Sequence, residues 1–160
     1  HERYLRRASA WPNGCHVSEV EVDPDTGQVI VARYTVVDDF GTIINPLIVT
    51  GMVHGGIAQG AGQALFEDLV YDGESGQLMT GSFMDYCLPK ADDLCGVSVA
   101  FNEVPTDTNP LGVKGCGEAD TIGATPALMN AVINALSEFG VTELTCPATP
   151  QRVWRAIHGS

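Results

Sequence analysis

The sequence predicts an α+β fold, in which a hairpin and further strands pack with about three helices. Residues 15–22 alternate in polarity, residues 28–37 are rich in β-branched side chains, and a turn sequence separates them, as in a β-hairpin. Thr-Pro pairs at 125–126 and 149–150 precede segments with helical spacing of apolar residues. Strands and helices alternate without the strict βαβ order of a parallel sheet. The length of 160 residues fits a single domain over 1–160.

The predicted hairpin consists of the strands 15–22 and 28–37, joined by the turn sequence DPDTG at 23–27. Gly27 is expected where the backbone needs a positive φ. Two aspartates in the turn are compatible with calcium, but the later ligands of a calcium-binding loop are missing. We therefore interpret the segment as a plain turn.

Residues 47–66 are an uncharged run that is just long enough to cross a bilayer. Its five glycines, two glutamines and one histidine are unfavourable in lipid. We interpret it as a buried helix that ends near Leu69 and uses its glycines at close contacts, with no membrane span. Met52, Met79 and Met84 are expected to fill the core.

The second half of the chain predicts two strands, over 78–88 and 96–104, and then a helix that begins at Thr125-Pro126. The apolar stripe of this helix is Leu128, Val132, Leu136 and Phe139, and Gly140 ends it. A short strand over 141–144 and a final helix beginning at Thr149-Pro150 complete the expected elements.

Charge and cysteine content exclude several classes of function. The net charge is -12, from 20 acidic and 8 basic residues, so phosphate backbones and anionic membranes would repel the protein. No two of the five cysteines are three residues apart, which argues against a zinc or iron–sulfur ligand set. Their odd, scattered count is typical of reduced thiols and favours a cytoplasmic location.

The stretch GVKGCGEADTIGA at 112–124 is the candidate functional loop. Its glycines leave backbone N–H groups free to bind an anion, and Lys114 adds a positive charge, so a phosphate- or nucleotide-binding module is one hypothesis. The order of lysine and glycines is not that of a Walker A loop, and a purely structural loop remains an alternative.

Glu118, between Gly117 and Ala119, is the residue of this loop that a turn does not require. Its carboxylate is solvated, a helix-terminus partner or a catalytic base. Cys116 with His54 or His16 would make a Cys–His hydrolase, an alternative for which the sequence offers little.

Several blocks of the chain, in order, resemble the large subunits of the molybdenum hydroxylases, the family of xanthine dehydrogenase, aldehyde oxidoreductase and aerobic carbon monoxide dehydrogenase. The blocks are DDFGTIINP, VHGGIAQGAGQALFE, GSFMDYCLP, VPTDTNPLGVKGCGEA and PATPQRVWRAI. The resemblance implies the molybdopterin-binding domain of that family and an oxidoreductase that hydroxylates an aldehyde, purine or N-heterocycle, or oxidises CO. The product oxygen would come from water, and Glu118 would be the general base.

The resemblance also implies the cofactors and partners. Molybdenum would be held by a molybdopterin, in bacteria usually the cytosine dinucleotide form, without a direct protein ligand. Lys114, Gly115, Cys116 and Gly117 would border the pterin through their backbone. Gln59 would hydrogen-bond the cofactor or, alternatively, a neighbouring helix. A 2Fe-2S centre and FAD would lie on partner subunits or domains of a dimeric assembly.

Two residues depart from the family pattern, and the chain is shorter than the family's subunits. Asp120 stands where glycine is commonest, and Thr125 where proline is frequent. A second acid near Glu118 is expected to raise the pKa of that group. Since the chain resembles only the C-terminal part of a large subunit, we expect the isolated fragment to bind no cofactor. A non-catalytic assembly domain is the alternative.

Overall fold

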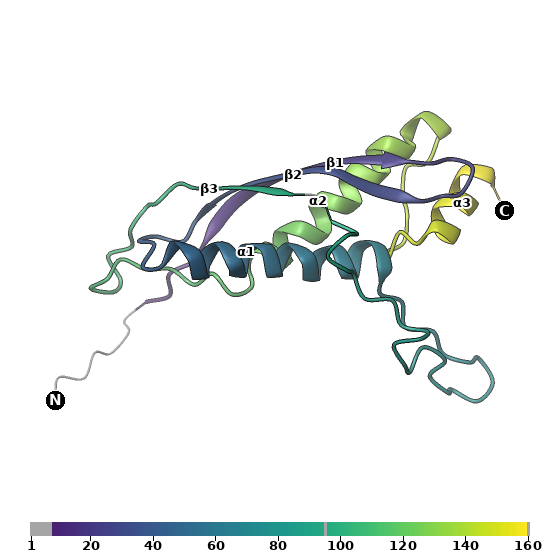
Figure 1. Ribbon diagram of the computed structural model, residues 1–160, viewed down its shortest axis with the longest axis horizontal. Helices are drawn as coiled ribbons and strands as arrows, with labels where there is room; N and C mark the ends of the chain where they lie inside the picture. Colours follow the sequence, from purple (N-terminus) through teal and green to yellow (C-terminus); the bar gives the residue numbers. More distant parts are fainter. Residues whose placement is uncertain (1–7, 95, 160) are drawn as a thin grey trace.

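The computed structural model describes residues 8–94 and 96–159, and within them it confirms the predicted α+β class. A three-stranded sheet is covered on one face by two long helices, with a third, short helix near the hairpin turn (Figure 1). The elements are β1 Asn13–Val22, β2 Val29–Asp39, α1 Pro46–Ala61, β3 Val97–Phe101, α2 Ala119–Leu136 and α3 Pro150–His158.

The hairpin prediction is confirmed. Strands β1 and β2 pair antiparallel from Asn13 opposite Asp39 to Val22 opposite Val29. The turn closes through the Asp23 carboxylate, which accepts hydrogen bonds from the backbone of Asp25 and the hydroxyl of Thr26. Gly27 has a φ of 73°, as expected.

Strand β3 makes the sheet mixed, because it runs parallel to β2 in the order β1-β2-β3. The register places Tyr34 opposite Val97 and Asp38 opposite Phe101. The prediction of a strand within 96–104 is therefore confirmed over five residues. Alternate residues of β2, including Tyr34 and Val36, are buried under the helices and form the centre of the core.

Helix α1 begins where Asn45 caps it, accepting a hydrogen bond from the N–H of Ile48. The glycines predicted at close contacts are found there for Gly56 and Gly60. A β-carbon at Gly60 would lie 2.7 Å from the β-carbon of Ala124 on α2. The two backbones therefore approach closely. Gly55 faces open space instead, with nothing within 4 Å.

The helix ends earlier than predicted. Helix α1 passes into a single wide turn over Gly62–Phe66, and the expected end near Leu69 is wrong by three residues. Leu69 is exposed. The described residues contain no helix long and apolar enough to cross a membrane.

Helix α2 begins at Ala119, so the predicted start at Thr125-Pro126 is wrong, and Pro126 lies inside the helix. The hydroxyl of Thr125 does not cap α2; it donates to the carbonyl of Gly60 on α1, 3.3 Å away. Packing against α1 keeps the residues before the proline helical, and this tertiary contact outweighs the local sequence preference.

The apolar stripe of α2 is confirmed for its first three members and wrong for the fourth. Leu128, Val132 and Leu136 are fully buried, whereas Phe139 is 45% exposed in the 3₁₀ turn that follows the helix. Gly140, with a φ of 77°, ends the helical segment as predicted. The last helix, α3, is capped by Thr149, whose hydroxyl accepts from the N–H of Arg152.

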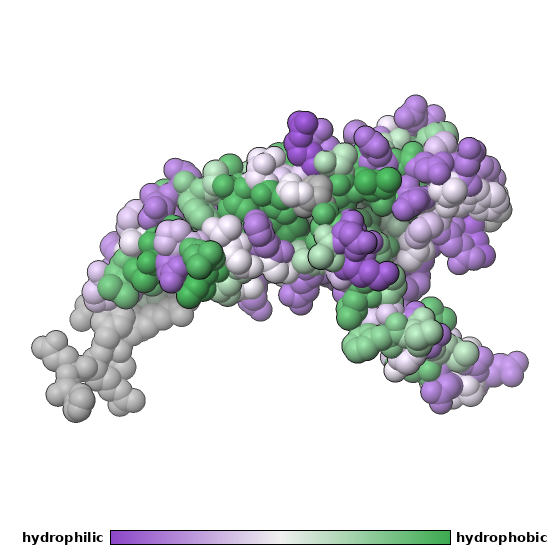
Figure 2. All heavy atoms as spheres, in the orientation of Figure 1, coloured by the Kyte–Doolittle hydropathy of each residue, from purple (hydrophilic) through white to green (hydrophobic). Residues whose placement is uncertain are grey.

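Two predicted strands are wrong: the described residues form no strand over 78–88 or 141–144. The segment 67–94 projects from the body as irregular turns and carries exposed hydrophobic side chains (Figures 1 and 2). Met79 and Met84 are 56% and 93% exposed, so their assignment to the core is also wrong. Both segments are strand-like in sequence, but among the described residues neither joins the sheet.

Candidate functional site

The glycine-rich loop is attached to the end of β2 by backbone contacts. The N–H of Lys114 donates to the carbonyl of Phe40, and Val113 bridges Gly41. Gly112, with a φ of 68°, accepts from the N–H of Thr42 through its carbonyl. These contacts place the following residues of the loop, including Glu118, beside the open end of the hairpin.

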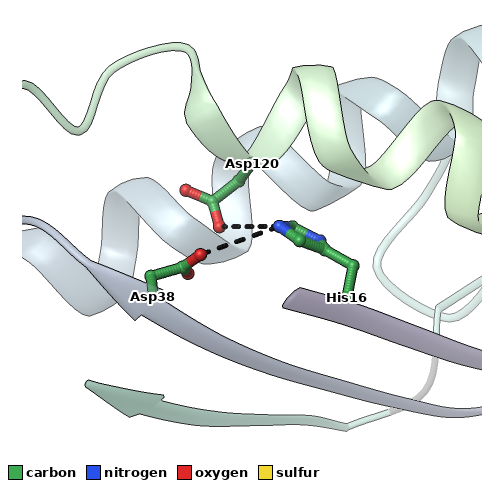
Figure 3. Close-up of side chains that lie close together, drawn as sticks. All are labelled: His16, Asp38 and Asp120. Carbon is green, nitrogen blue, oxygen red and sulfur yellow. Dashed lines mark ion pairs between the residues drawn. The ribbon is translucent and has the colours of Figure 1, made fainter. Parts of the chain in front are cut away.

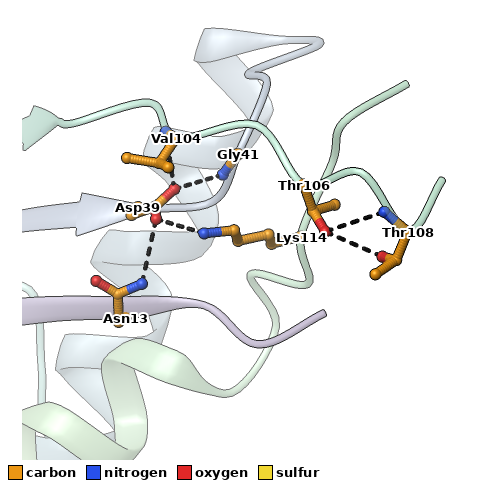
Figure 4. A network of polar contacts seen from close by, with 7 residues as sticks. All are labelled: Asn13, Asp39, Gly41, Val104, Thr106, Thr108 and Lys114. Atoms are coloured by element: carbon orange, nitrogen blue, oxygen red, sulfur yellow. Dashed lines mark hydrogen bonds and ion pairs between the residues drawn. The ribbon is translucent and has the colours of Figure 1, made fainter. Parts of the chain in front are cut away.

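The side chain of Lys114 forms an ion pair with Asp39 in a largely buried network (Figure 4). Asp39 also accepts hydrogen bonds from the N–H groups of Gly41 and Val104 and from the amide of Asn13. Burial would raise the pKa of Asp39, but these donors, Lys114 first among them, lower it to about 2. The lysine charge is therefore neutralised within the protein, which weakens the hypothesis of a phosphate site built on Lys114.

Glu118 stands immediately before α2, in the N-cap position, but its side chain does not cap the helix. The side chain is exposed, and its carboxylate makes no hydrogen bond or ion pair with residues 8–94 and 96–159. Only its backbone carbonyl is engaged, accepting from the N–H of Ile122. The carboxylate is free to act on a group outside this chain.

The loop before Glu118 presents bare backbone. A β-carbon at Gly115 would meet nothing within 4 Å, and one at Gly117 only the terminal methyl of Met52, 3.7 Å away. In the described part of the chain, the N–H groups of Gly115, Gly117 and Glu118 have no acceptor. Such groups can donate to oxygen or nitrogen atoms of a ligand.

A cavity of about 590 Å³ lies between the start of β1 and the start of α2. Its lining includes Gly115, Gly117 and Glu118 together with His16 and Asp38. The base candidate and the bare backbone therefore face one shared space.

Comparison with known proteins identifies the family. Residues 2–95 match the family described as the molybdopterin cofactor-binding domain. The chain belongs to this family. The match covers more than half of the 160 residues, although the Glu118 loop lies beyond it.

Curated relatives of this molybdopterin cofactor-binding domain extend the similarity through the loop. The nicotine 6-hydroxylase large subunit of Paenarthrobacter nicotinovorans is 46% identical over 147 residues, or 92% of this chain. The carbon monoxide dehydrogenase large chain of Hydrogenophaga pseudoflava is 35% identical over the same share. The chain spans 18% of the length of each of these relatives.

Solved structures show the same fold. The carbon monoxide dehydrogenase of Oligotropha carboxidovorans superposes with a TM-score of 0.88 at 32% identity, over 92% of this chain and 18% of that one. The quinoline 2-oxidoreductase of Pseudomonas putida 86 superposes with a TM-score of 0.86 at 41% identity, over 89% of this chain and 18% of that chain.

The thiol of Cys116 contacts helix α1. Its Sγ lies 3.6 Å from the sulfur of Met52, which is 40% exposed and contacts the loop rather than filling the core as predicted. Burial, with a further contribution from the charge of Asp120, raises the pKa of Cys116. In the described residues neither His16 nor His54 contacts this thiol, which disfavours a Cys–His hydrolase.

Gln59 lies on α1, where its side chain is exposed. Its amide oxygen accepts a hydrogen bond from the hydroxyl of Thr121 on α2, at 3.3 Å. Gln59 therefore makes the hydrogen bond to a neighbouring helix that was its alternative role, and its hydrogen bond to the cofactor stays a prediction.

The sequence did not predict a cluster of His16, Asp38 and Asp120 beside the same cavity (Figure 3). Asp120 is 1% exposed and lies close to the other two residues, in the first turn of α2. Burial, reinforced by the negative charge of Asp120, raises the pKa of Asp38 to about 7, and burial also raises that of Asp120. The only sequence signal for this cluster was Asp120 itself, which stands where the family most often has glycine.

Proposed function

We propose that this chain is the C-terminal segment of the molybdenum-cofactor-binding large subunit of an oxidoreductase. That enzyme hydroxylates an electron-poor carbon with oxygen from water, and Glu118 is the general base. The observation that carries the proposal is the free Glu118 carboxylate on bare backbone beside a cavity, in a chain of the molybdopterin family.

The residues present fit a pterin-type group. The free N–H groups of Gly115, Gly117 and Glu118 would hold its polar atoms, and the missing side chains at the two glycines leave room for its approach. When bound, the molybdenum cofactor supplies the activated oxygen and accepts the two electrons of the oxidation. We propose the cytosine dinucleotide form, with a 2Fe-2S centre and FAD on partner subunits or domains of a dimer.

The work of the chain itself is to accept a proton. The backbone bond from Lys114 to Phe40 anchors the loop to the end of β2, and the carbonyl of Glu118 accepts a hydrogen bond from the first turn of α2. These contacts fix the backbone of Glu118 while its carboxylate stays free. A positioned base contributes about 10²–10⁴-fold to the rate. Lys114 acts through Asp39, stabilising the loop rather than contacting substrate.

The relatives favour a nitrogen heterocycle among the possible substrates. The two named for nicotine and quinoline are 46% and 41% identical to this chain, against 35% and 32% for the two carbon monoxide dehydrogenases. We therefore place N-heterocycles ahead of aldehydes, purines and CO.

The test uses the complete enzyme, purified with its partner subunits. Molybdenum and acid-released CMP are measured per large subunit, followed by turnover with an N-heterocycle, an aldehyde, xanthine and CO. We expect about one molybdenum and about one CMP per large subunit, together with turnover of the N-heterocycle. A folded, assembled protein without molybdenum would support the assembly-domain alternative instead.

A further inference from the structure

The cluster of His16, Asp38 and Asp120 brings together three elements of the fold. His16 comes from β1, Asp38 from β2 and Asp120 from the first turn of α2 (Figure 3). The Nε2 atom of His16 lies 3.8 Å from Oδ1 of Asp38 and 4.0 Å from Oδ1 of Asp120. One ligand atom from each residue falls within 4.8 Å of the other two.

The two carboxylates are buried without enough partners. Asp38 and Asp120 are each 1% exposed. Oδ2 of Asp38 and both oxygens of Asp120 accept no hydrogen bond from residues 8–94 and 96–159. His16 is their only ion-pair partner in the described chain. Buried carboxylates of this kind need a compensating positive charge or a proton.

The space for the cluster depends on two glycines. A β-carbon at Gly123 would stand 2.5 Å from Nε2 of His16, and one at Gly14 would stand 2.0 Å from Oδ1 of Asp38. Any other residue at either position would displace the side chains of the cluster. Both glycines line the cavity that Glu118 shares, so a small ion can reach the cluster from it.

The imidazole is oriented by a buried tyrosine. Nδ1 of His16 lies 2.7 Å from the hydroxyl of Tyr34, which is 1% exposed. This hydrogen bond leaves Nε2 facing the two carboxylates. A histidine that binds a metal ion commonly has its second ring nitrogen held in this way.

We propose that His16, Asp38 and Asp120 form a binding site for one divalent transition-metal ion of the zinc or manganese type. One imidazole nitrogen with two carboxylate oxygens suits these ions, whereas calcium and magnesium prefer oxygen ligands alone. Ligand atoms around tetrahedral zinc stand roughly 3.4 Å apart, so the two distances from Nε2 of His16 have to shorten by about half an ångström.

The charge and the position of the ion explain its role. Two positive charges balance the two carboxylates. The ion joins β1 and β2 to the first turn of α2, two residues after Glu118, and so fixes the helix start that follows the base. The site uses none of the groups proposed to hold the molybdenum cofactor, and its test does not depend on the proposed function.

The experiment measures zinc binding to the purified complete enzyme after dialysis against a chelator. Zinc, manganese, molybdenum and iron are counted separately, so that cofactor metals do not interfere. The expected result is one zinc per chain, a rise in the thermal unfolding midpoint, and one anomalous diffraction peak at the zinc edge between His16, Asp38 and Asp120.

Three variants decide the outcome. D120N should weaken zinc binding at least about tenfold, and Y34F, which keeps all three ligands, by about 10–100-fold. D25N, at an exposed turn, should bind zinc as the wild type does.

Circular dichroism verifies the fold of each variant. Wild-type protein that binds neither zinc nor manganese overturns the proposal and leaves a carboxyl pair that shares a proton. Unchanged binding by D120N and Y34F also overturns it.

Discussion

The ammonium group of Lys114 contacts the Asp39 carboxylate across 75 positions of sequence. The side chains are 12% and 6% exposed, so this is an ion pair shielded from water. It joins the glycine-rich loop to the end of β2, beside the backbone bond from Lys114 to Phe40. The lysine of the loop thus holds the loop in place.

Removal of the Lys114 charge is expected to destabilise the protein. K114M leaves the Asp39 carboxylate charged and buried, with only its neutral donors, and we expect a loss of about 3 kcal/mol in the free energy of unfolding. Equilibrium urea unfolding measures it. The double variant K114M/D39N should recover part of the loss, since no unpaired charge remains. An unchanged midpoint for K114M would show that the pair contributes nothing.

The close approach of α1 and α2 predicts opposite effects for two glycines of one helix. G60A introduces a β-carbon 2.7 Å from that of Ala124 and should cost about 1–3 kcal/mol. G55A meets nothing within 4 Å and should stabilise the helix by up to about 1 kcal/mol. Urea unfolding of both variants checks this difference. Equal shifts would contradict the packing described.

Replacement of Glu118 separates catalysis from stability. E118Q should reduce turnover of the complete enzyme by about 10²–10⁴-fold, because the base is lost. Its free energy of unfolding should not change, since the side chain is exposed and has no partner in the described chain. E138Q, at another exposed glutamate, is the matched control. Wild-type turnover by E118Q at equal molybdenum content would exclude Glu118 as the base.

The Cys146 thiol should titrate at higher pH in the folded protein than in the unfolded one. Although Cys146 is exposed, partial desolvation of its thiol raises the pKa, and Arg152 partly opposes the shift. The S–H donates to the carbonyl of Gln63 at 3.0 Å. Since only the thiolate is alkylated, the iodoacetamide rate at Cys146 should rise at a higher pH than in urea. Mass spectrometry of the Cys146 peptide follows the rate. Coincident pH profiles in the two states would contradict the assignment.

Local patterns predicted the parts of the fold that depend on near neighbours. The hairpin followed from alternation in 15–22, β-branched residues in 28–37 and a turn with Gly27 between them. The start of α3 followed from Thr149 before Pro150, because a helix cap is made within a few residues. The same local rule failed at Thr125-Pro126. There the Thr125 hydroxyl donates to a carbonyl of α1, and the helix starts at Ala119, seven residues before the predicted first helical residue, Pro126.

Sequence by itself determined the family resemblance, the α+β class and the candidate base Glu118, because these rest on ordered motifs and on a carboxylate that a turn does not need. Tertiary structure alone decided that Lys114 is neutralised by Asp39, that Met84 lies in solvent, and that Asp120 meets His16. The reason is physical: each of these outcomes depends on partners distant in the chain, and their burial and charge arise only once the sheet and helices pack.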